Sequence, residues 1–225
     1  MSFEESFVSF MNSLANFIKD VTKNSEKKHL QKICPLVLEN TIFIDNKSSV
    51  SVSIQKADKT SCSIYAMSKE DADSIDIKTE SFESKSIVTI TSSRNNLINV
   101  SLLIQIPSPI INLTYLVSNG NIKLENLNIG TLNIKQTNGN ILCLGLEGND
   151  YHIETINGKI KVGTSTFDKC ELKTNNGNIL VKGCGSLFDL CVHSNNGKVS
   201  IRDIVQGGSK KLTCTSDNGN IFVEN

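Results

Sequence analysis

Two hydrophobic periods divide the chain. Up to residue 21 the apolar residues recur at steps of three and four, which is the period of a helix with one buried side. From Leu36 onward the period is two, as in residues 41–44, 50–54 and 98–102, and this alternation is typical of strands with one buried face. The pattern predicts one N-terminal amphipathic helix followed by an all-β protein.

The predicted helix carries a stripe of phenylalanines. Its apolar side is formed by Phe3, Phe7, Phe10, Leu14 and Phe17, and charged and amide side chains occupy the other side. Stripes of this kind mostly pack on their own protein, so we expect this one to dock on the sheet that follows. A partner's groove and a helix–helix dimer are the alternatives. Membrane adhesion is disfavoured because the polar side is not basic.

The sequence repeats after residue 109. Asn-Gly occurs six times, and successive glycines are 19, 19, 19, 20 and 22 residues apart. Positions seven and five before each glycine, and two and four after it, are almost wholly apolar, while the positions between them are mostly polar. A period near 20 residues is typical of a solenoid, in which each coil buries its apolar side against the next. The predicted turn residues are Asn119, Gly120, Asn138, Gly139, Asn157, Gly158, Asn176, Gly177, Asn196, Gly197, Asn218 and Gly219.

These patterns predict three parts. Residues 1–31 are the amphipathic helix and a linker, residues 32–109 are an irregular β-strand region that opens the solenoid, and residues 110–225 are a regular solenoid of about six coils of 19–22 residues. The predicted fold class is therefore all-β, a parallel β-solenoid of Asn-Gly-turn repeats with less regular N-terminal strands and one N-terminal amphipathic helix.

Asn-Gly suits the corner of a coil for two reasons. Glycine adopts positive φ without steric cost, and asparagine tolerates it better than most residues. Stacked asparagine amides about 4.8 Å apart can also hydrogen-bond as a ladder. A β-hairpin is the competing use of Asn-Gly, but it explains a single pair and not six in register.

The repeat resembles a known family. The motif Ser/Thr-Asn-Gly-Asn-Ile at residues 118–122 and 137–141, the alternating strand that ends at residues 106–107 and the looser opening at 44–52 are similar to the β-solenoid domains described in bacteria as "putative adhesin", which have eukaryotic relatives. The likeness covers residues 36–225. The resemblance implies the solenoid fold and adhesion or binding, and the family has no catalytic motif to transfer.

Composition limits the classes of partner and the cellular compartment that we expect. With 23 basic and 23 acidic residues the chain has no net charge to attract nucleic acid or an anionic membrane. Its longest apolar stretch is too short and too interrupted for a membrane span. Glu4 and Glu5 stand where a secretory signal would be basic, so the expected location is cytoplasmic.

The seven cysteines suggest reduced thiols. Their number is odd, and no pair has the spacing of a zinc site. Cys191 falls at an outward position and is the candidate for reactivity. The thiols expected to be buried and inert are Cys143, Cys170, Cys184 and Cys214.

No catalytic constellation emerges from the columns of the repeat. Asp150 and Asp189 share a column, but Lys169 occupies that column between them. His152 and His193 lie in different outward columns, without a nucleophile beside them. We therefore expect no catalytic residue, no metal ligand and no cofactor.

One outward column is partly apolar. Three residues after the glycines stand Leu142, Leu180 and Phe222, which alternate with lysines or serine. They would require a cover, and the N-terminal helix, a partner protein or a second copy could supply it. We also expect the last coil, which ends near Val223, to be an open end where either the helix or a second copy packs.

The leading functional hypothesis is a non-catalytic scaffold that presents a long flat face to a protein partner or a second copy. One alternative is an exported surface adhesin or carbohydrate-binding module. The other is a carbohydrate-active β-helix enzyme, which is disfavoured because the columns bring no group of carboxylates together.

Overall fold

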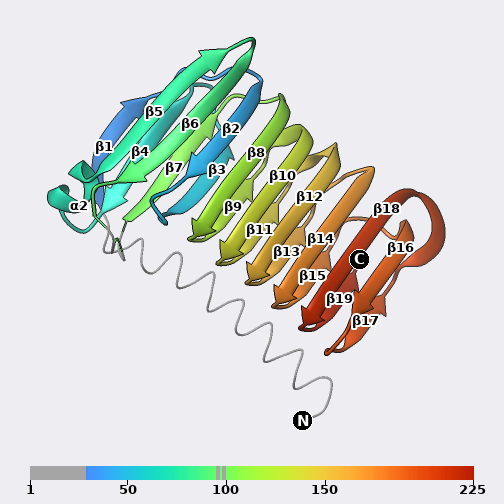
Figure 1. Cartoon of the computed structure of the whole chain (residues 1–225). Coiled ribbons are helices and arrows are strands. Elements are labelled where there is room, and N and C mark those ends of the chain that lie inside the picture. The colour runs from blue at the N-terminus through green and yellow to red at the C-terminus, as the bar shows by residue number, and fades with distance from the viewer. Residues whose placement is uncertain (1–28, 95–96, 98–99) are drawn as a thin grey trace.

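The computed structural model describes residues 29–94, 97 and 100–225. The predicted N-terminal helix, with its stripe from Phe3 to Phe17, lies outside these residues. The described chain is almost entirely β-structure, stacked strand upon strand into two sheets that enclose one apolar interior (Figure 1). Most neighbouring strands run parallel, which fits a β-solenoid.

Sheet A contains ten strands and sheet B contains nine. In spatial order sheet A consists of β1 (His29–Pro35), β4 (Ser61–Ala66), β7 (Val100–Ile106), β3 (Ser51–Lys56), β9 (Ile122–Glu125), β11 (Ile141–Leu144), β13 (Ile160–Gly163), β15 (Ile179–Lys182), β19 (Ile221–Glu224) and β17 (Val199–Arg202). Sheet B consists of β16 (Leu187–Ser194), β18 (Val205–Asn218), β14 (Lys169–Asn176), β12 (Glu147–Asn157), β10 (Asn128–Asn138), β8 (Ile110–Asn119), β2 (Thr41–Asn46), β6 (Lys85–Ser92) and β5 (Ile75–Phe82).

Each Asn-Gly repeat forms one coil. A longer strand in sheet B leads into the Asn-Gly corner, and a four-residue strand in sheet A leaves it, as in β10 and β11. Equivalent residues of neighbouring coils lie opposite each other, so that Leu132 pairs with Leu113 on one side and Tyr151 on the other. The apolar columns of the sequence therefore become continuous rows inside the stack.

Those rows form the core. At the four predicted inward positions every side chain is buried in the coils β8–β9, β10–β11, β12–β13, β14–β15 and β18–β19. Full burial of one aliphatic side chain contributes roughly 1.5–3 kcal/mol in transfer terms. The coil β16–β17 differs, since Val199 and Ile201 keep 43% and 45% of their surface exposed. The stack is therefore uncovered at this coil.

The coils are not stacked in chain order. The last coil of the sequence, β18–β19, lies between β14–β15 and β16–β17 (Figure 1). The expectation that the coil ending near Val223 forms the open end is therefore wrong, because the preceding coil does so. At the other end of the repeats, the coil β2–β3 likewise lies between β6–β7 and β8–β9.

The inserted position of the last coil pairs opposite charges on the outward face of sheet A. Lys182 of β15 lies opposite Glu224 of β19, with 3.4 Å between Nζ and Oε2, and Glu224 also lies opposite Arg202 of β17. Chain order would place Lys182 opposite Arg202, and like charges directly opposite each other destabilise a sheet. Residues 207–210 bulge out of β18 and supply the length needed for the return.

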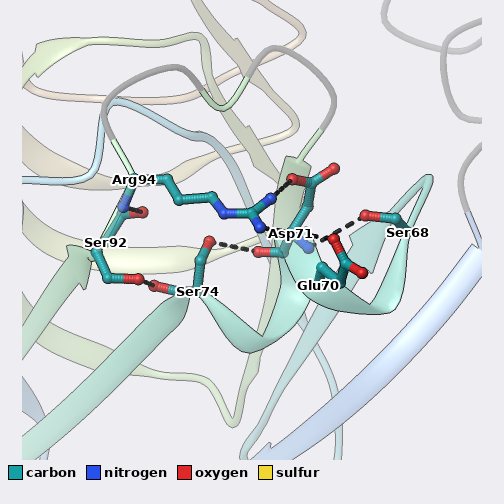
Figure 2. A network of polar contacts seen from close by, with 7 residues as sticks. Ser68, Glu70, Asp71, Ser74, Ser92 and Arg94 are labelled. Atoms are coloured by element: carbon teal, nitrogen blue, oxygen red, sulfur yellow. Dashed lines mark hydrogen bonds and ion pairs between the residues drawn. The ribbon is translucent and has the colours of Figure 1, made fainter.

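The opposite end of the stack is built differently, although its edge strands β1 and β5 also expose apolar side chains such as Ile33 and Phe82. There β1 and β5 pair antiparallel with their neighbours, and the short helix α2 (Lys69–Asp73) contacts β1, β4 and β5. Arg94 joins this helix through Asp71 at 2.9 Å and Glu70 at 3.6 Å, and the Ser68 hydroxyl accepts a hydrogen bond from the Asp71 N–H (Figure 2). The two ends of the molecule are therefore unlike.

Candidate interaction surfaces

An asparagine ladder runs along the corners of the coils. The Nδ2 groups of Asn138, Asn157 and Asn176 donate to Oδ1 of the asparagine in the preceding coil, at 2.7, 2.8 and 2.8 Å. Asn218 continues the ladder by donating to Asn176, and Asn196 donates to Asn218. The ladder follows the spatial order of the coils, and Asn138, Asn157, Asn176 and Asn218 each act as both donor and acceptor.

The corner glycines are required for two different reasons. Gly120 and Gly139 have φ values of 124° and 132°, a region that L side chains rarely adopt. At the remaining four, the explanation from positive φ is wrong, because φ lies outside that region. A Cβ there would collide with the carbonyl oxygen of the neighbouring coil's corner glycine. These four are Gly158, Gly177, Gly197 and Gly219.

A polar column closes the interior beside the corners, and the sequence analysis did not identify it. Three residues before the glycines, side chains donate to the glycine carbonyl of a neighbouring coil: Gln136 Nε2 to Gly120 at 2.7 Å and Thr174 Oγ1 to Gly158 at 3.0 Å. These positions are an even number of residues from the apolar columns, so they lie on the same, inward side of the strand. This spacing could have identified the polar column from the sequence. The column consists of Gln136, Thr155, Thr174, Ser194 and Ser216.

The outward face of sheet B is polar and charged. Glu154 lies between Lys135 and Lys173 in one lateral row, with 3.5 Å from its Oε1 to the Lys173 Nζ. In the adjacent row His152 lies 3.4 Å from a carboxylate oxygen of Glu171. A depression of about 490 Å³ crosses β2, β8, β10 and β12 on this face. Its lining includes Asp45, Lys47, Leu116, Lys135, Glu154 and Ile156.

The outward face of sheet A carries a row of a different kind, which we call the sheet A row. Its members lie opposite one another on successive strands and are Leu103, Ser53, Lys123, Leu142, Lys161, Leu180 and Phe222. Leu142, Leu180 and Phe222 retain only 4%, 1% and 4% of their surface, although they are not part of the interior cluster. These three residues, which alternate with polar residues in the sequence, therefore lie in one row on the outward face of sheet A. Phe222 lies beside Leu180 because the last coil is inserted next to β15.

The open end at β16–β17 exposes both strand edges and apolar side chains. Val199 and Ile201 occupy inward columns that in the other coils are covered by a neighbour. Leu187 and Val205, where β16 and β18 begin, are exposed as well. Such an edge is available for contact with another chain.

The candidate carboxylates and histidines do not assemble into a catalytic site. Asp150 and Asp189 are separated by Lys169 and also by Lys211 of the inserted strand β18. Strands β14 and β18 separate His152 on β12 from His193 on β16, and His193 Nε2 is 2.7 Å from Asn195 Oδ1. His29, the first residue of the edge strand β1, is exposed.

Most of the thiols are buried. Burial raises the pKa of Cys143, Cys170 and Cys214 well above the ordinary value, and nearby thiols raise it further. The pKa of Cys62 rises to about 12, chiefly through burial and then through Cys34, its partner across the β1–β4 pair. Cys184 is also buried, and burial raises its pKa.

Cys191 lies on the outward side of the edge strand β16 and is exposed. It shares this side with His193, two residues further along. The described depression lies on strands β2 to β12, away from these two residues.

The described part of the chain holds neither a group of metal ligands nor a membrane-spanning helix. Among residues 29–94, 97 and 100–225, no three His, Cys, Asp or Glu side chains are grouped so that they could hold a metal ion. Within the same ranges, no helix has the length and apolar character to cross a bilayer.

Comparisons with known proteins point to one family. A family model described as Toastrack DUF4097 matches residues 37–225. No curated protein matches the sequence. A solved "putative cell adhesion protein" from Clostridium sporogenes has 14% identity, covers 86% of this chain and 97% of its own, and gives a TM-score of 0.48.

Two further solved structures are similar over comparable lengths. A "putative adhesin" from Bacteroides fragilis has 15% identity, coverage of 86% and 95%, and a TM-score of 0.45. A "putative lipid binding protein" from Parabacteroides distasonis has 14% identity, coverage of 85% and 96%, and a TM-score of 0.39.

Proposed function

This chain belongs to the Toastrack DUF4097 family, and from that premise we propose that it is a non-catalytic interaction scaffold that presents the outward face of sheet B to a protein partner. The family match accounts for the coils but supplies no reacting group. The candidate residues for chemistry are dispersed over the stack, as Asp150 and Asp189 illustrate.

The size and charge of the sheet B face carry this proposal. The strands from β2 to β16 cover about 29 Å across the stack, at about 4.8 Å per strand, and about 26 Å along eight residues. The resulting area of about 750 Å² is close to the roughly 800 Å² that one partner buries in a typical stable interface. Charges of both signs alternate across it, as in Lys135, Glu154 and Lys173, and this favours a partner with complementary charges.

The depression gives this face a place for an anchoring side chain. Ile156 and Leu116 supply apolar contact there, and Lys135 and Glu154 border them. Interfaces concentrate their energy where one large side chain fills a pocket surrounded by polar contacts. We therefore place the centre of the interface over β8 to β12.

Charge reversal tests the proposal. Proteins from the source cell are captured on the wild-type chain, on the double variant Lys135→Glu/Ile156→Asp and on Lys59→Glu, whose side chain is exposed in the turn after β3. A captured protein is then purified and its affinity for each variant is measured by calorimetry. We expect binding to wild type and Lys59→Glu with equal affinity, and at least about tenfold weaker binding to the double variant.

Equal binding of that protein to all three forms would remove the sheet B face from the proposal. Failure of any purified protein to bind the wild-type chain would remove the scaffold function itself. If thermal unfolding shows that the double variant keeps its stability, its loss of binding comes from the changed surface and not from unfolding.

The cytosol is the compartment we propose for this function. Seven cysteines cannot all be paired within one chain, and Cys34 faces Cys62 without a bond. Unpaired thiols suit a reducing compartment.

The depression also supports a second candidate, carbohydrate binding. Carboxylates such as Asp45 and Glu154 can accept hydrogen bonds from sugar hydroxyls, and Ile156 offers an apolar surface for a sugar ring. Glycan-array binding by the wild-type chain, abolished in Lys135→Glu/Ile156→Asp and kept in Lys59→Glu, would favour this candidate. An array without binding would exclude the glycans it contains.

A further inference from the structure

Two thiols face each other across the first strand pair of sheet A. Cys34 of β1 is the direct partner of Cys62 on β4 in an antiparallel ladder, and both thiols are free. Residues directly opposite in such a ladder point to the same face of the sheet, and their Cα atoms lie about 4.5–5.5 Å apart. A disulfide requires a Cα separation of about 4.4–6.8 Å. The register of β1 and β4 therefore meets the requirement for a bond between these thiols.

The other strand pairs offer no second arrangement of this kind. Within the part of the chain that the structure describes, every other cysteine that lies in a strand has a different residue type opposite it, as Cys191 has Thr213. The repeat columns therefore do not account for the pair, which joins an edge strand to its neighbour outside the Asn-Gly coils.

The two thiols differ in their access to solvent. Cys62 is fully buried and belongs to the interior cluster, whereas Cys34 packs against that cluster and stays partly exposed. Burial, and to a smaller extent the nearby Cys34, raise the pKa of Cys62 to about 12. A reagent that arrives from solvent therefore meets Cys34 first, with Cys62 behind it.

We propose that Cys34 and Cys62 form a thiol–disulfide site that reacts with a small disulfide and then links β1 covalently to β4. In the first step the Cys34 thiolate attacks one sulfur of the small disulfide, so that a mixed disulfide forms and one thiolate leaves. In the second step Cys62 loses its proton to solvent and attacks the Cys34 sulfur, which releases the second thiolate. Each released thiolate takes up a proton. The small disulfide is thereby reduced, and the two protein thiols are oxidised.

The second step depends on pH. Only the thiolate attacks a disulfide, and the raised pKa keeps Cys62 protonated near neutral pH. Formation of the internal bond should therefore become faster as the pH rises toward about 12. The mixed disulfide at Cys34 is the species that accumulates when the second step is slow.

The bond would hold a weakly anchored strand. β1 pairs with β4 alone, and most of its side chains are exposed, as at Leu30 and Ile33. A strand with few buried contacts opens locally at low cost in free energy. Its opening uncovers the edge of β4, where Cys62 and Ile64 are fully buried. Oxidation therefore keeps this edge covered, and reduction leaves it able to open. This inference does not depend on the function proposed for sheet B.

Oxidised glutathione is the probe for this site in the full chain. The starting variant is Cys191→Ser, which removes the exposed thiol of β16, and it is incubated at about pH 9, where ordinary thiols are largely deprotonated. Thiol titration in denaturant should show a loss of two thiols per chain. Mass spectrometry of the digested protein should find the peptide with Cys34 linked to the peptide with Cys62.

Two further substitutions in that variant separate the steps. Cys62→Ala should stop the reaction at one glutathione adduct on Cys34, because the second nucleophile is missing. Cys34→Ser should leave Cys62 unmodified, because its thiol is buried. Circular dichroism shows whether each variant keeps the fold.

Hydrogen exchange measures the effect on the strand. In the oxidised protein the amides of β1 should exchange at least about tenfold more slowly than in the reduced protein. The matched control is β5, an antiparallel edge strand whose pair with β6 contains no cysteine, and its exchange should be the same in both forms. Addition of a dithiol reductant should restore the faster exchange of β1.

The proposal is overturned if the completed reaction leaves glutathione on Cys34 and a free Cys62, or if the linked peptides contain other cysteines. It is equally overturned if neither thiol reacts until the protein is unfolded. An internal bond that leaves the exchange of β1 unchanged would refute its role in holding the strand.

Discussion

At the scale of single residues, the corner of the coil depends on steric contact between neighbouring coils. The backbone of one corner glycine lies against the carbonyl oxygen of the glycine before it, so that any side chain at Gly158 or Gly177 would push the coils apart. The asparagine ladder beside them adds side-chain hydrogen bonds at the same repeat distance. Local conformational preference explains only Gly120 and Gly139.

Gly158→Ala should therefore destabilise the protein by about 1–3 kcal/mol or more, the range for an overfilled site. Gly163→Ala is the matched control, because the tightest contact of its Cβ would be with the flexible side chain of Leu144 at 3.0 Å, and its nearest backbone atom would be 3.8 Å away. Denaturant unfolding measures both. A loss for Gly163→Ala as large as for Gly158→Ala would contradict the role of the corner.

The reactivity of each thiol depends on its own exposure to solvent. Cys191 is exposed on β16, whereas Cys62, Cys143, Cys170 and Cys214 are buried. We expect Cys191 to react first with a maleimide under native conditions, since the buried thiols must wait for unfolding. Mass spectrometry of digested protein locates the label, and denaturant should make all seven thiols reactive. Early labelling of Cys143 would contradict the buried interior.

The raised pKa values of the buried thiols make the free energy of unfolding depend on pH. Above about pH 9 the unfolded chain releases thiol protons, while folded Cys62 keeps its proton until about pH 12. The unfolded state then binds fewer protons, so the free energy of unfolding falls as the pH rises through this window. Denaturant midpoints at pH 8 and pH 10 measure the fall. It should be smaller in Cys62→Ala, and an equal fall in both forms would remove Cys62 from the explanation.

At the scale of elements, the coils differ mainly in the outward side chains that they bring opposite one another. All six coils present nearly the same inward columns and the same Asn-Gly corner, so these features do not select an order. Glu224 lies between Lys182 and Arg202, and Phe222 lies beside Leu180. The bulge at residues 207–210 then allows β18 to return to the side of β14.

A pair of single variants tests the coil order. Thr215→His would place a second imidazole opposite His193 on the adjacent strand β18, and two such histidines can bind Ni²⁺. Lys173→His would lie beside His193 only if the coils followed chain order. We expect saturating Ni²⁺ to raise the Tm of Thr215→His and not that of Lys173→His, because a ligand stabilises the state that binds it. If Ni²⁺ raised the Tm of Lys173→His and not that of Thr215→His, strands β14 and β16 would be neighbours, as chain order requires.

At the scale of the whole molecule, the two ends of the stack are built differently. The end near β1 has antiparallel strands, helix α2 and the Arg94 network. At the other end the coil β16–β17 exposes inward-column residues that every other coil of the repeat buries. Position in the stack, rather than residue type, therefore determines the cost of a substitution in an inward column.

Val181→Lys and Ile201→Lys make this comparison directly. Both residues stand four positions after a corner glycine, but Val181 is 1% exposed and Ile201 is 45% exposed. We expect Val181→Lys to lose several kcal/mol, because it buries a charge, and Ile201→Lys to lose less than about 1 kcal/mol. Thermal and denaturant unfolding measure the difference. Similar losses at both positions would show that β16–β17 is covered in solution.

The sequence by itself determined which side chains form the interior and where the coils turn. Alternation along a strand fixes the face of each residue locally, and six repeats of the same alternation made the columns readable, as at Leu132 and Ile134. The turn at Asn-Gly was identified for the same reason, although close approach between coils applies at all six glycines and is the sole reason at four of them. The outward line of Leu142 and Leu180 was also visible from the repeat.

Only the tertiary structure decided which coils touch, which end is open and which outward residues meet. These properties depend on pairing between strands that are distant in sequence, and coils with equivalent inward columns compete for the same places. The observed order brings together contacts that no local period encodes, such as Lys182 with Glu224 at 3.4 Å and Leu180 with Phe222.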